Sequence, residues 1–315
     1  MRVLLTGATG FIGSAVHTAF VRNGSIWVRQ LVRQPATSEP EDPTRTFVGD
    51  LCDPASIRGA CDGIDTIVHA ASYVGADPTL CDRVNRQGTL HLLDEATRAG
   101  VRKVFYVSTA AVYGAGPHRG LPEDAIPPAP LSPASASRAA AEEQVRAYGG
   151  CVLRPYLIYG PRDRWFVPNL VALLRVLPHW IDGGRARLSV VNVRDLARLV
   201  AALVTRDVPP GSVYHANHPE PVTVRAAGEA LARHLGVRVP GDTPAPDSGP
   251  PLPPGLPARH LQMISTDHWY DSRRVWELTG CPFGAAFPDD LADAPSWYPE
   301  LAEPTATALP TLPRM

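Results

Sequence analysis

The sequence predicts an α/β fold: a doubly wound parallel sheet followed by a smaller C-terminal region. Three observations support this expectation. Short apolar runs alternate with helical patterns over the first half of the chain, a glycine-rich turn directly follows the first apolar run, and the composition changes beyond about residue 161. With 315 residues and 44% hydrophobic composition, the chain is long enough to bury a large core.

The apolar runs predict six strands in the first half of the chain, at residues 3–6, 25–33, 46–49, 66–71, 103–108 and 151–158. Between them lie helical patterns such as those at 83–99 and 137–148. Strands that alternate with helices form parallel sheets whose two faces are both covered by helices. We therefore expect a buried sheet with helices on each side.

The glycine-rich turn is the most informative motif. Gly7, Gly10 and Gly13 follow the first strand with the spacing G-x-x-G-x-x-G and open a helical stretch. Gly7 permits the tight strand-to-helix turn, Gly10 lets the backbone approach a pyrophosphate, and Gly13 lets the helix pack on the sheet. The motif predicts a Rossmann-type dinucleotide site, with Thr9 and residues 11–12 (Phe11 and Ile12) beside the phosphates.

We expect residues 1–160 to form this nucleotide-binding domain, together with a returning segment at about 190–216. Residues 161–315 then form mainly a substrate-binding region. Residues 240–257 are dense in proline, which excludes a helix or a central strand. This segment is expected to be a surface loop, and a linker is favoured over a lid.

Composition excludes several classes of function. The net charge of −1 gives no basic footprint for nucleic acid. No signal peptide or apolar run of about 18 residues is present, so we expect a cytoplasmic protein without a membrane span. The five cysteines are scattered and odd in number, which favours reduced thiols. His215 and His218 lack a partnering cluster, so no metal site is expected.

A series of motifs in a fixed order resembles the extended short-chain dehydrogenase/reductases. This group includes nucleotide-sugar epimerases and dehydratases, 3β-hydroxysteroid dehydrogenases and dihydroflavonol reductases. The matching segments are GATGFIG at 7–13, GDLCD at 49–53, VHAAS at 68–72, VNRQGTLHLLDEA at 84–96, VSTAAVYG at 107–114, LRPYLIYGPRD at 153–163, VNVRDLARLVAAL at 191–203 and DSRRVWELTG at 271–280. The resemblance implies a Rossmann fold, a nicotinamide dinucleotide cofactor, a small-molecule substrate and a monomeric or homodimeric state.

The resemblance also implies which residues contact the cofactor. Beyond the glycine turn, these are Asp50 and Leu51 at the adenine, and further residues after the fourth and sixth strands: Ala70, Ala71, Ser72, Pro155 and Tyr156. Asp50 would accept a hydrogen bond from the exocyclic amine of the adenine. Taken alone, it could equally be a turn residue.

Arg33 indicates which dinucleotide is bound. It lies twenty residues after Gly13, at the end of the second strand, where an NAD enzyme of this type usually carries an acidic residue for the ribose 2′-hydroxyl. A guanidinium there would pair with a 2′-phosphate. We therefore expect NADPH, with NADH as a weaker alternative and with Arg22 and Arg29 adding positive charge. The other interpretation of Arg33 is a solvated arginine at a strand end.

The catalytic centre departs from the family pattern of a serine or threonine, a tyrosine, and a lysine four residues after the tyrosine. Lys103 is the only lysine, and no Y-x-x-x-K occurs. Alignment of the flanking residues, including Glu142, puts Ala134 at the tyrosine position and Arg138 at the lysine position. Thr109 matches the hydroxyl that polarises the substrate carbonyl, and Ser108 beside it is a further catalytic candidate. Asn85 matches a structural asparagine.

This substitution removes a proton donor. The family's tyrosine exchanges a proton near neutral pH, whereas alanine exchanges none. Arg138 can still hydrogen-bond the nicotinamide ribose, but a guanidinium is a poor acid. Hydride transfer needs only a positioned nicotinamide and carbonyl. The proton must then come from a substrate hydroxyl, a water or one of four nearby side chains, namely Ser135, Ser137, Tyr113 and Tyr156.

Three functions remain open: an atypical NADPH-dependent ketoreductase, a nucleotide-sugar epimerase or dehydratase, and a non-catalytic NADP-binding sensor. Epimerases and dehydratases begin by oxidising an alcohol, which demands a base at position 134, so Ala134 favours the ketoreductase. The chain resembles the atypical ketoreductases of angucyclinone antibiotic biosynthesis (the simocyclinone type). An apolar, aromatic stretch then either receives a bulky aromatic or polyketide ketone or packs into the core: Trp165, Phe166, Leu170, Leu173, Leu174, Leu177 and Trp180.

Overall fold

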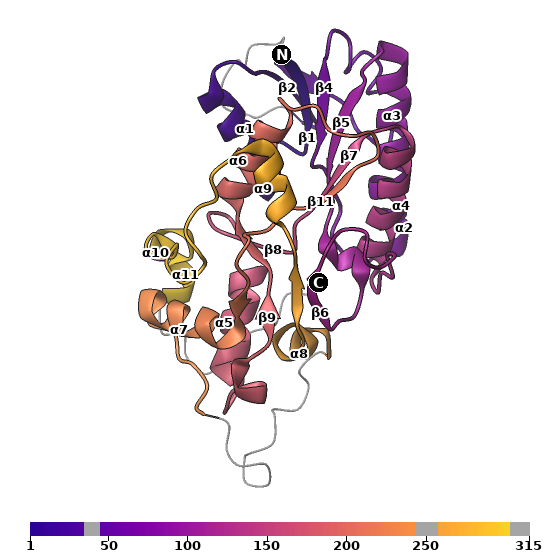
Figure 1. The fold of residues 1–315 in the computed structure, drawn as a ribbon. Helices are drawn as coiled ribbons and strands as arrows, with labels where there is room; N and C mark the ends of the chain where they lie inside the picture. The colour runs from indigo at the N-terminus through magenta and orange to yellow at the C-terminus, as the bar shows by residue number, and fades with distance from the viewer. Residues whose placement is uncertain (35–44, 243–257, 303–315) are drawn as a thin grey trace.

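A seven-stranded parallel sheet forms the upper part of the molecule (Figure 1). The computed structural model describes residues 1–34, 45–242 and 258–302. The strand order is β11-β7-β5-β4-β1-β2-β3. The chain builds the sheet outwards from β1 to β3 and then returns to add β4 on the other side of β1, so the topological switch point lies between β1 and β4. The strands are β1 (Arg2–Thr6), β2 (Trp27–Val32), β3 (Thr46–Val48), β4 (Thr66–His69), β5 (Lys103–Val107), β7 (Cys151–Arg154) and β11 (Val213–His215). The predicted α/β Rossmann fold is confirmed.

Helices cover both faces of this sheet (Figure 1). One face carries α1 (Phe11–Asn23), α6 (Val193–Leu203) and α9 (Arg273–Thr279). The other carries α2 (Pro78–Cys81), the π-helical turn η1 (Asp82–Gln87), α3 (Gly88–Ala99) and α4 (Pro133–Ala147). The strands β1, β4, β5, β7 and β11 are accordingly buried over most of their length, which explains their nearly continuous apolar sequences. The strands β2 and β3, at one edge of the sheet, are only partly buried.

The predicted strand at 151–158 is wrong as a single element, because the chain leaves the sheet after Arg154. Pro155 has no N–H to donate to a neighbouring strand. The next amide, that of Tyr156, donates to the side chain of Asn217 at 2.7 Å. The chain then forms β8 (Leu157–Tyr159), which pairs with β10 (Val190–Asn192) in a separate two-stranded sheet.

A smaller region lies below the sheet in Figure 1. Its four-stranded sheet has the order β12-β9-β13-β6. The strands are β6 (His118–Leu121), β9 (Arg187–Leu188), β12 (Val222–Thr223) and β13 (His268–Tyr270). The remaining helices are η2 (Ala110–Tyr113), α5 (Phe166–Val176), η3 (Ile181–Gly184), α7 (Val224–Leu235), α8 (Ala258–Ser265), α10 (Ala294–Trp297) and α11 (Pro299–Ala302).

The returning segment rejoins the large sheet. Helix α6 packs against α1, and β11 pairs with β7 at the sheet edge. The division into 1–160 and 161–315 stays a prediction. Most of the proline-rich segment, residues 243–257, lies outside the described residues.

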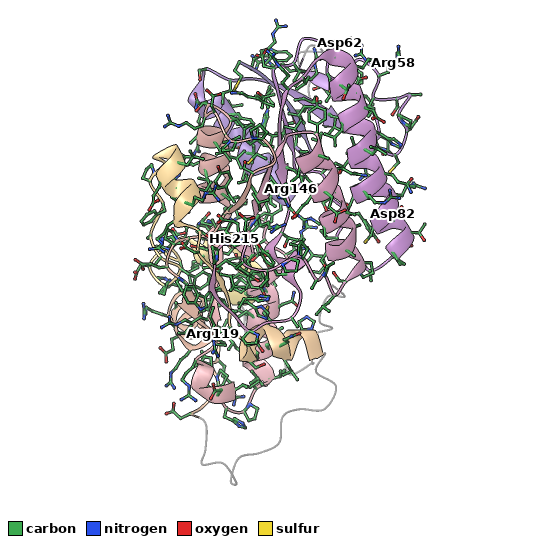
Figure 2. All side chains as sticks on the ribbon, turned by 45° about the vertical axis from the view of Figure 1, so that its right-hand side comes forward. Arg58, Asp62, Asp82, Arg119, Arg146 and His215 are labelled. Carbon is green, nitrogen blue, oxygen red and sulfur yellow. The ribbon has the colours of Figure 1, made fainter. Side chains whose placement is uncertain are left out.

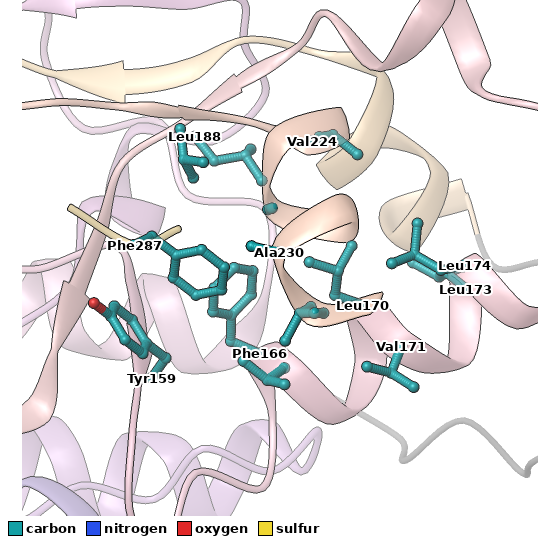
Figure 3. Packing of buried hydrophobic residues seen from close by; sticks show 14 of the residues in the cluster. Tyr159, Phe166, Leu170, Val171, Leu173, Leu174, Leu188, Val224, Ala230 and Phe287 are labelled. Carbon is teal, nitrogen blue, oxygen red and sulfur yellow. The ribbon is translucent and has the colours of Figure 1, made fainter. Parts of the chain in front are cut away.

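Of the two alternatives for the apolar stretch in and around α5, packing into the core is confirmed, and a substrate-facing surface is wrong for its buried residues. Phe166, Leu170, Leu173, Leu174, Leu177 and Trp180 are all buried in one hydrophobic cluster. Figure 3 shows the α5 side chains packed towards Ala230 of α7 and towards Phe287. The apolar face of this helix is buried against α7. Trp165 alone stays 38% exposed.

Candidate active site

The glycine turn forms a backbone cradle between β1 and α1. Gly7 has φ +72°, and a Cβ added there would lie 2.6 Å from the Ala71 amide nitrogen. A Cβ on Gly13 would lie 2.0 Å from the Gly7 carbonyl oxygen. Gly10 caps α1 without any side-chain hydrogen bond to the first helical amides. Those amides remain free to bind an anion, so the turn fits the pyrophosphate of a dinucleotide.

The segment after β4 runs against this turn. Ala70 and Ala71 are the residues that a side chain on Gly7 would strike. The Ala71 amide donates to the Thr6 hydroxyl at 3.2 Å, and Ser72 donates to Asn85 Oδ1 at 3.2 Å. The proposed cofactor residues of both segments therefore lie at one edge of the sheet.

The adenosine end of the candidate site is more open. Arg33 is exposed and lies directly after β2. Asp50 Oδ1 accepts from the Cys52 amide at 2.9 Å, so this carboxylate also shapes a turn, while the Leu51 carbonyl accepts from His91. Arg29 does not join Arg33, because its guanidinium donates to the Ala60 and Asp62 carbonyls.

Thr109 lies at the end of β5, where the substrate carbonyl is expected. It caps η2, since its Oγ1 accepts from the Ala111 amide at 3.1 Å. The Ala110 amide donates to the Pro155 carbonyl at 2.8 Å, which joins this turn to the end of β7. Ser108 is buried, and its hydroxyl has no hydrogen-bond partner among the described residues.

The start of α4 has the geometry of a catalytic helix without the reactive side chains. Ser132 and Ser135 form a capping box, and Pro133 occupies the first turn. Ser137 accepts from Asn85 Nδ2 at 2.9 Å and donates to the Ala134 carbonyl at 3.1 Å. Arg138 Nη2 donates to the Val107 carbonyl at 2.9 Å. The structure thus brings the guanidinium to the end of β5, two residues before Thr109.

Three of the side chains considered as proton donors have structural partners. Ser135 belongs to the capping box, and Ser137 bridges Asn85 and Ala134. The Tyr113 hydroxyl lies 2.9 Å from the Glu123 carbonyl, and burial raises its pKa to about 12. None of the three offers a proton that is both acidic and free.

Tyr113 belongs instead to a buried cluster beneath the site. Its hydroxyl accepts from Arg154 Nη1 at 2.7 Å and lies 2.7 Å from His215 Nε2. Figure 2 shows His215 at mid-height of the molecule, where the large sheet meets the smaller region. The Tyr156 ring packs against His268 and Tyr270, and burial raises the pKa of its phenol.

A buried histidine that the sequence interpretation did not single out joins β1, on the cofactor side, to α3. His69 Nδ1 lies 2.6 Å from Thr6 Oγ1, and Nε2 lies 2.9 Å from Thr89 Oγ1. The Thr89 hydroxyl donates to the Asn85 carbonyl, so it can only accept from His69. His69 is therefore protonated on Nε2 and accepts from Thr6 on Nδ1. The only sequence signal was its place in VHAAS, between a buried strand and two cofactor candidates.

The environment keeps His69 neutral. Burial, together with the positive charge of Arg138, lowers its pKa to about 3. Its ring also stacks on that of Tyr106 from the adjacent strand. His69 therefore holds the Thr6 and Asn85 segments together as a fixed neutral tautomer and does not carry protons.

The described residues contain neither a membrane-spanning helix nor a cluster of metal-binding side chains. Within residues 1–34, 45–242 and 258–302, no helix has the length and apolar character needed to cross a membrane. The same ranges hold no group of three or more histidine, cysteine or acidic side chains placed to bind a metal ion.

Comparisons with known proteins agree with this geometry. Residues 3–216 match the NAD dependent epimerase/dehydratase family. A ketoreductase of 4-hydroxy-2-methyl-3-oxo-4-farnesyl-3,4-dihydroquinoline-1-oxide from Stigmatella aurantiaca is 30% identical over 250 residues, 76% of this chain and 74% of that protein. A dTDP-glucose 4,6-dehydratase from Streptomyces antibioticus is 33% identical, over 75% of this chain and 78% of that one.

Solved structures show the same fold. A UDP-glucose 4-epimerase from Thermus thermophilus in complex with NAD has a TM-score of 0.70 at 26% identity, covering 93% of this chain and 97% of that one. A dTDP-glucose 4,6-dehydratase from Streptomyces venezuelae with NAD bound has a TM-score of 0.74 at 25% identity, covering 95% and 97%. The chain therefore belongs to the NAD-dependent epimerase/dehydratase family, the extended short-chain dehydrogenase/reductases, whose cofactor is NAD(P).

Proposed function

We propose that this protein is an NADPH-dependent ketoreductase with an atypical active site. One observation carries the proposal: the helix start that should bear the catalytic tyrosine is intact, but position 134 is alanine, whereas the carbonyl-binding hydroxyl of Thr109 is kept. A site of this kind can still orient a ketone for reduction. It cannot remove a proton from an alcohol at position 134, which oxidation would require.

The chain's own residues would hold the two reactants. The cradle of Gly7, Gly10 and Gly13 would bind the pyrophosphate, and Arg33 would pair with a 2′-phosphate. Arg138 would donate to the nicotinamide ribose, and Thr109 would donate to the substrate carbonyl oxygen. When bound, the reduced nicotinamide supplies the hydride.

The proton is proposed to come from the substrate or from a water. Tyr113, Ser135 and Ser137 are engaged in structural hydrogen bonds, and burial raises the pKa of Tyr156. A hydroxyl of the substrate next to the reacting carbonyl can donate to the oxygen as the hydride arrives. Such a donor makes a protein acid unnecessary.

The substrate is proposed to be a bulky, aromatic or polyketide ketone. Because α5 is core, this proposal no longer rests on that helix. Its support comes from relatives whose names describe bulky ring substrates. The Stigmatella protein is named as a ketoreductase of a farnesylated quinoline oxide, and a 3β-hydroxysteroid dehydrogenase/isomerase from Mycobacterium tuberculosis, named for a steroid alcohol, is 30% identical over 265 residues.

A nucleotide-sugar epimerase or dehydratase is the second candidate, favoured by the relatives and solved structures of that kind. Its reaction begins with the oxidation of an alcohol, for which Ala134 provides no base. A non-catalytic NADP-binding sensor is the third candidate. It is less favoured, because a sensor would not need the hydroxyl of Thr109.

The test is incubation of the pure protein with NADPH and a panel of aromatic ketones, following reduced nicotinamide by absorbance. We expect NADPH to be oxidised in step with the ketone reduced, and much more slowly once a hydroxyl beside the carbonyl is methylated. Conversion of a nucleotide sugar without NADPH oxidation on any ketone would overturn the ketoreductase. Tight cofactor binding without any turnover would favour the sensor.

A further inference from the structure

Arg162 lies in a rigid turn between β8 and α5 and has a strained backbone. Its φ is +74°, a left-handed conformation that side chains other than glycine rarely adopt. The next residue, Asp163, is buried. It accepts from three backbone amides at the start of α5 at 2.7–2.9 Å and from the Tyr298 hydroxyl at 3.1 Å. The turn is therefore fixed by Asp163, while the side chain of Arg162 is left to reach outwards.

The guanidinium of Arg162 reaches the glycine turn, about 150 residues earlier in the chain. Nη2 donates to the Thr9 carbonyl at 3.0 Å, and Nη1 donates to the Ser14 hydroxyl at 2.8 Å. Thr9 lies within the glycine motif, and Ser14 lies in the first turns of α1. A residue from the second half of the chain thus sits at the edge of the cradle.

The charges around Arg162 are unbalanced. No Asp or Glu of the described ranges forms an ion pair with it, and both of its acceptors are neutral. Some other arginines are compensated: Arg154 pairs with Glu142, and Arg119 pairs with Asp267 at 2.7 Å. Arg29 and Arg138 resemble Arg162 in donating to neutral acceptors, but neither of them reaches the glycine turn. The N-terminus of α1 also carries partial positive charge. Two positive groups side by side, without a carboxylate, form an arrangement that an anion between them would stabilise.

We propose that Arg162 is a ligand of the cofactor's pyrophosphate and completes the anion site that the start of α1 begins. The inference rests on the dinucleotide site and not on the identity of the ketone. It differs from the role of Arg33, since a 2′-phosphate occurs only in NADPH while the pyrophosphate is common to NADPH and NADH. Strain in the turn is consistent with selection for the position of the guanidinium rather than for stability.

The matched variants are Arg162→Gly and Arg162→Lys. Glycine adopts φ +74° without strain, so Arg162→Gly removes the guanidinium while sparing the turn. Lysine keeps the charge but loses the two-pronged donor. Arg119→Ala, which removes an exposed arginine of the smaller region, is the control for net charge. Each is titrated by calorimetry with NADPH, NADH and ADP-ribose, and melting is measured without ligand.

We expect Arg162→Gly to lower the affinity for all three ligands by a similar factor, on the order of tenfold to a hundredfold. The affinities of Arg162→Lys should lie between those of Arg162→Gly and the native protein, and those of Arg119→Ala should be unchanged. The melting temperature of Arg162→Gly should not fall. Unchanged affinities would overturn the proposal, and so would a loss confined to NADPH or a loss that accompanies a lower melting temperature in Arg162→Gly. Since no ketone is present, failure of the ketoreductase assignment leaves this result unaffected.

Discussion

The glycine turn and the start of α4 differ in whether the same residues set the backbone and are proposed to contact the cofactor or substrate. At the turn, the residues that set the backbone are also the ones proposed to bind the cofactor: a Cβ on Gly7 would strike Ala71, and a Cβ on Gly13 would strike Gly7. At the start of α4, the residues that set the backbone are separate from those proposed to act on the substrate. Ser132, Ser135 and Ser137 form the hydrogen bonds of the helix start, whereas Ala134 and Arg138 are the residues that we propose to stand at the reactive positions.

The difference teaches why one region tolerates change and the other does not. A cradle made of backbone cannot lose its glycines without moving, because any side chain meets main-chain atoms. The start of α4 is held by its capping box and by Asn85, which donates to Ser137. Ala134 and Arg138 are half-buried and belong to neither of these contacts. On the proposed function, the side chains at these two positions can therefore change while the caps hold the helix start, and the chemistry can pass to other groups.

The largest effect is expected from Gly13→Ala. A Cβ there would lie 2.0 Å from the Gly7 carbonyl oxygen, so the turn or α1 must shift. We expect a loss of about 1–3 kcal/mol in the free energy of unfolding and a loss of NADPH affinity of a hundredfold or more, on the order of 3 kcal/mol. Chemical denaturation and calorimetry measure the two quantities.

Gly24→Ala is the control for this change. Gly24 ends α1 with φ +68°, but nothing lies within 4 Å of an added Cβ. It should cost about 1 kcal/mol of stability and leave NADPH affinity unchanged. Equal affinity losses in both variants would show that the turn is not specially constrained.

Thr109→Val tests the hydroxyl that the active site retains. If Thr109 orients the carbonyl, turnover on a true substrate should fall about tenfold to a thousandfold while the Kd for NADPH stays the same. Because the hydroxyl also caps η2, stability should fall by about 1 kcal/mol. Thr109→Ser keeps both functions and should stay active. An unchanged rate in Thr109→Val would mean that another group activates the carbonyl.

The sequence predicted more of the proposed cofactor site than of the proposed catalytic site. Glycine spacing reports backbone geometry directly, so the turn could be predicted from the sequence, and the family resemblance added Ala71 to the expected cofactor residues. Side chains that act through contacts distant in sequence could not. Arg162 meets Thr9, and His69 meets Thr89, only after the sheet has formed. Periodicity likewise could not distinguish a core α5 from a substrate-facing one, since both need an apolar face.

Arg33→Ala separates NADPH from NADH at the outer end of the site. A charge-assisted contact with the 2′-phosphate predicts that NADPH binding weakens by about 1.5–3 kcal/mol and that NADH binding is nearly unchanged. Calorimetry with both cofactors decides this. Equal loss for both, or loss for neither, would contradict the assignment of Arg33 and favour a solvated arginine.

The smallest effect concerns His69, which joins β1 to α3 through Thr6 on one side and Thr89 on the other. Its pKa is about 3 in the folded protein, against about 6.5 in an unfolded chain. At a pH between these two pKa values, His69 is protonated in the unfolded chain and neutral in the folded protein. The stability contributed by neutral His69 is therefore complete above about pH 6.5 and is lost as the pH falls towards 3.

At pH 5 this loss should be about 2 kcal/mol in the free energy of unfolding, since each pKa unit corresponds to about 1.4 kcal/mol. His215, whose pKa burial lowers to about 4, adds a similar loss, and buried carboxyls such as Glu123, with a raised pKa, act in the opposite direction. These contributions cancel when the native protein is compared with His69→Gln. We expect the variant to be less stable at pH 7 but to lose about 2 kcal/mol less than the native protein between pH 7 and pH 5, as measured by urea unfolding. Parallel losses in the two proteins would mean that His69 is not held neutral in the folded protein.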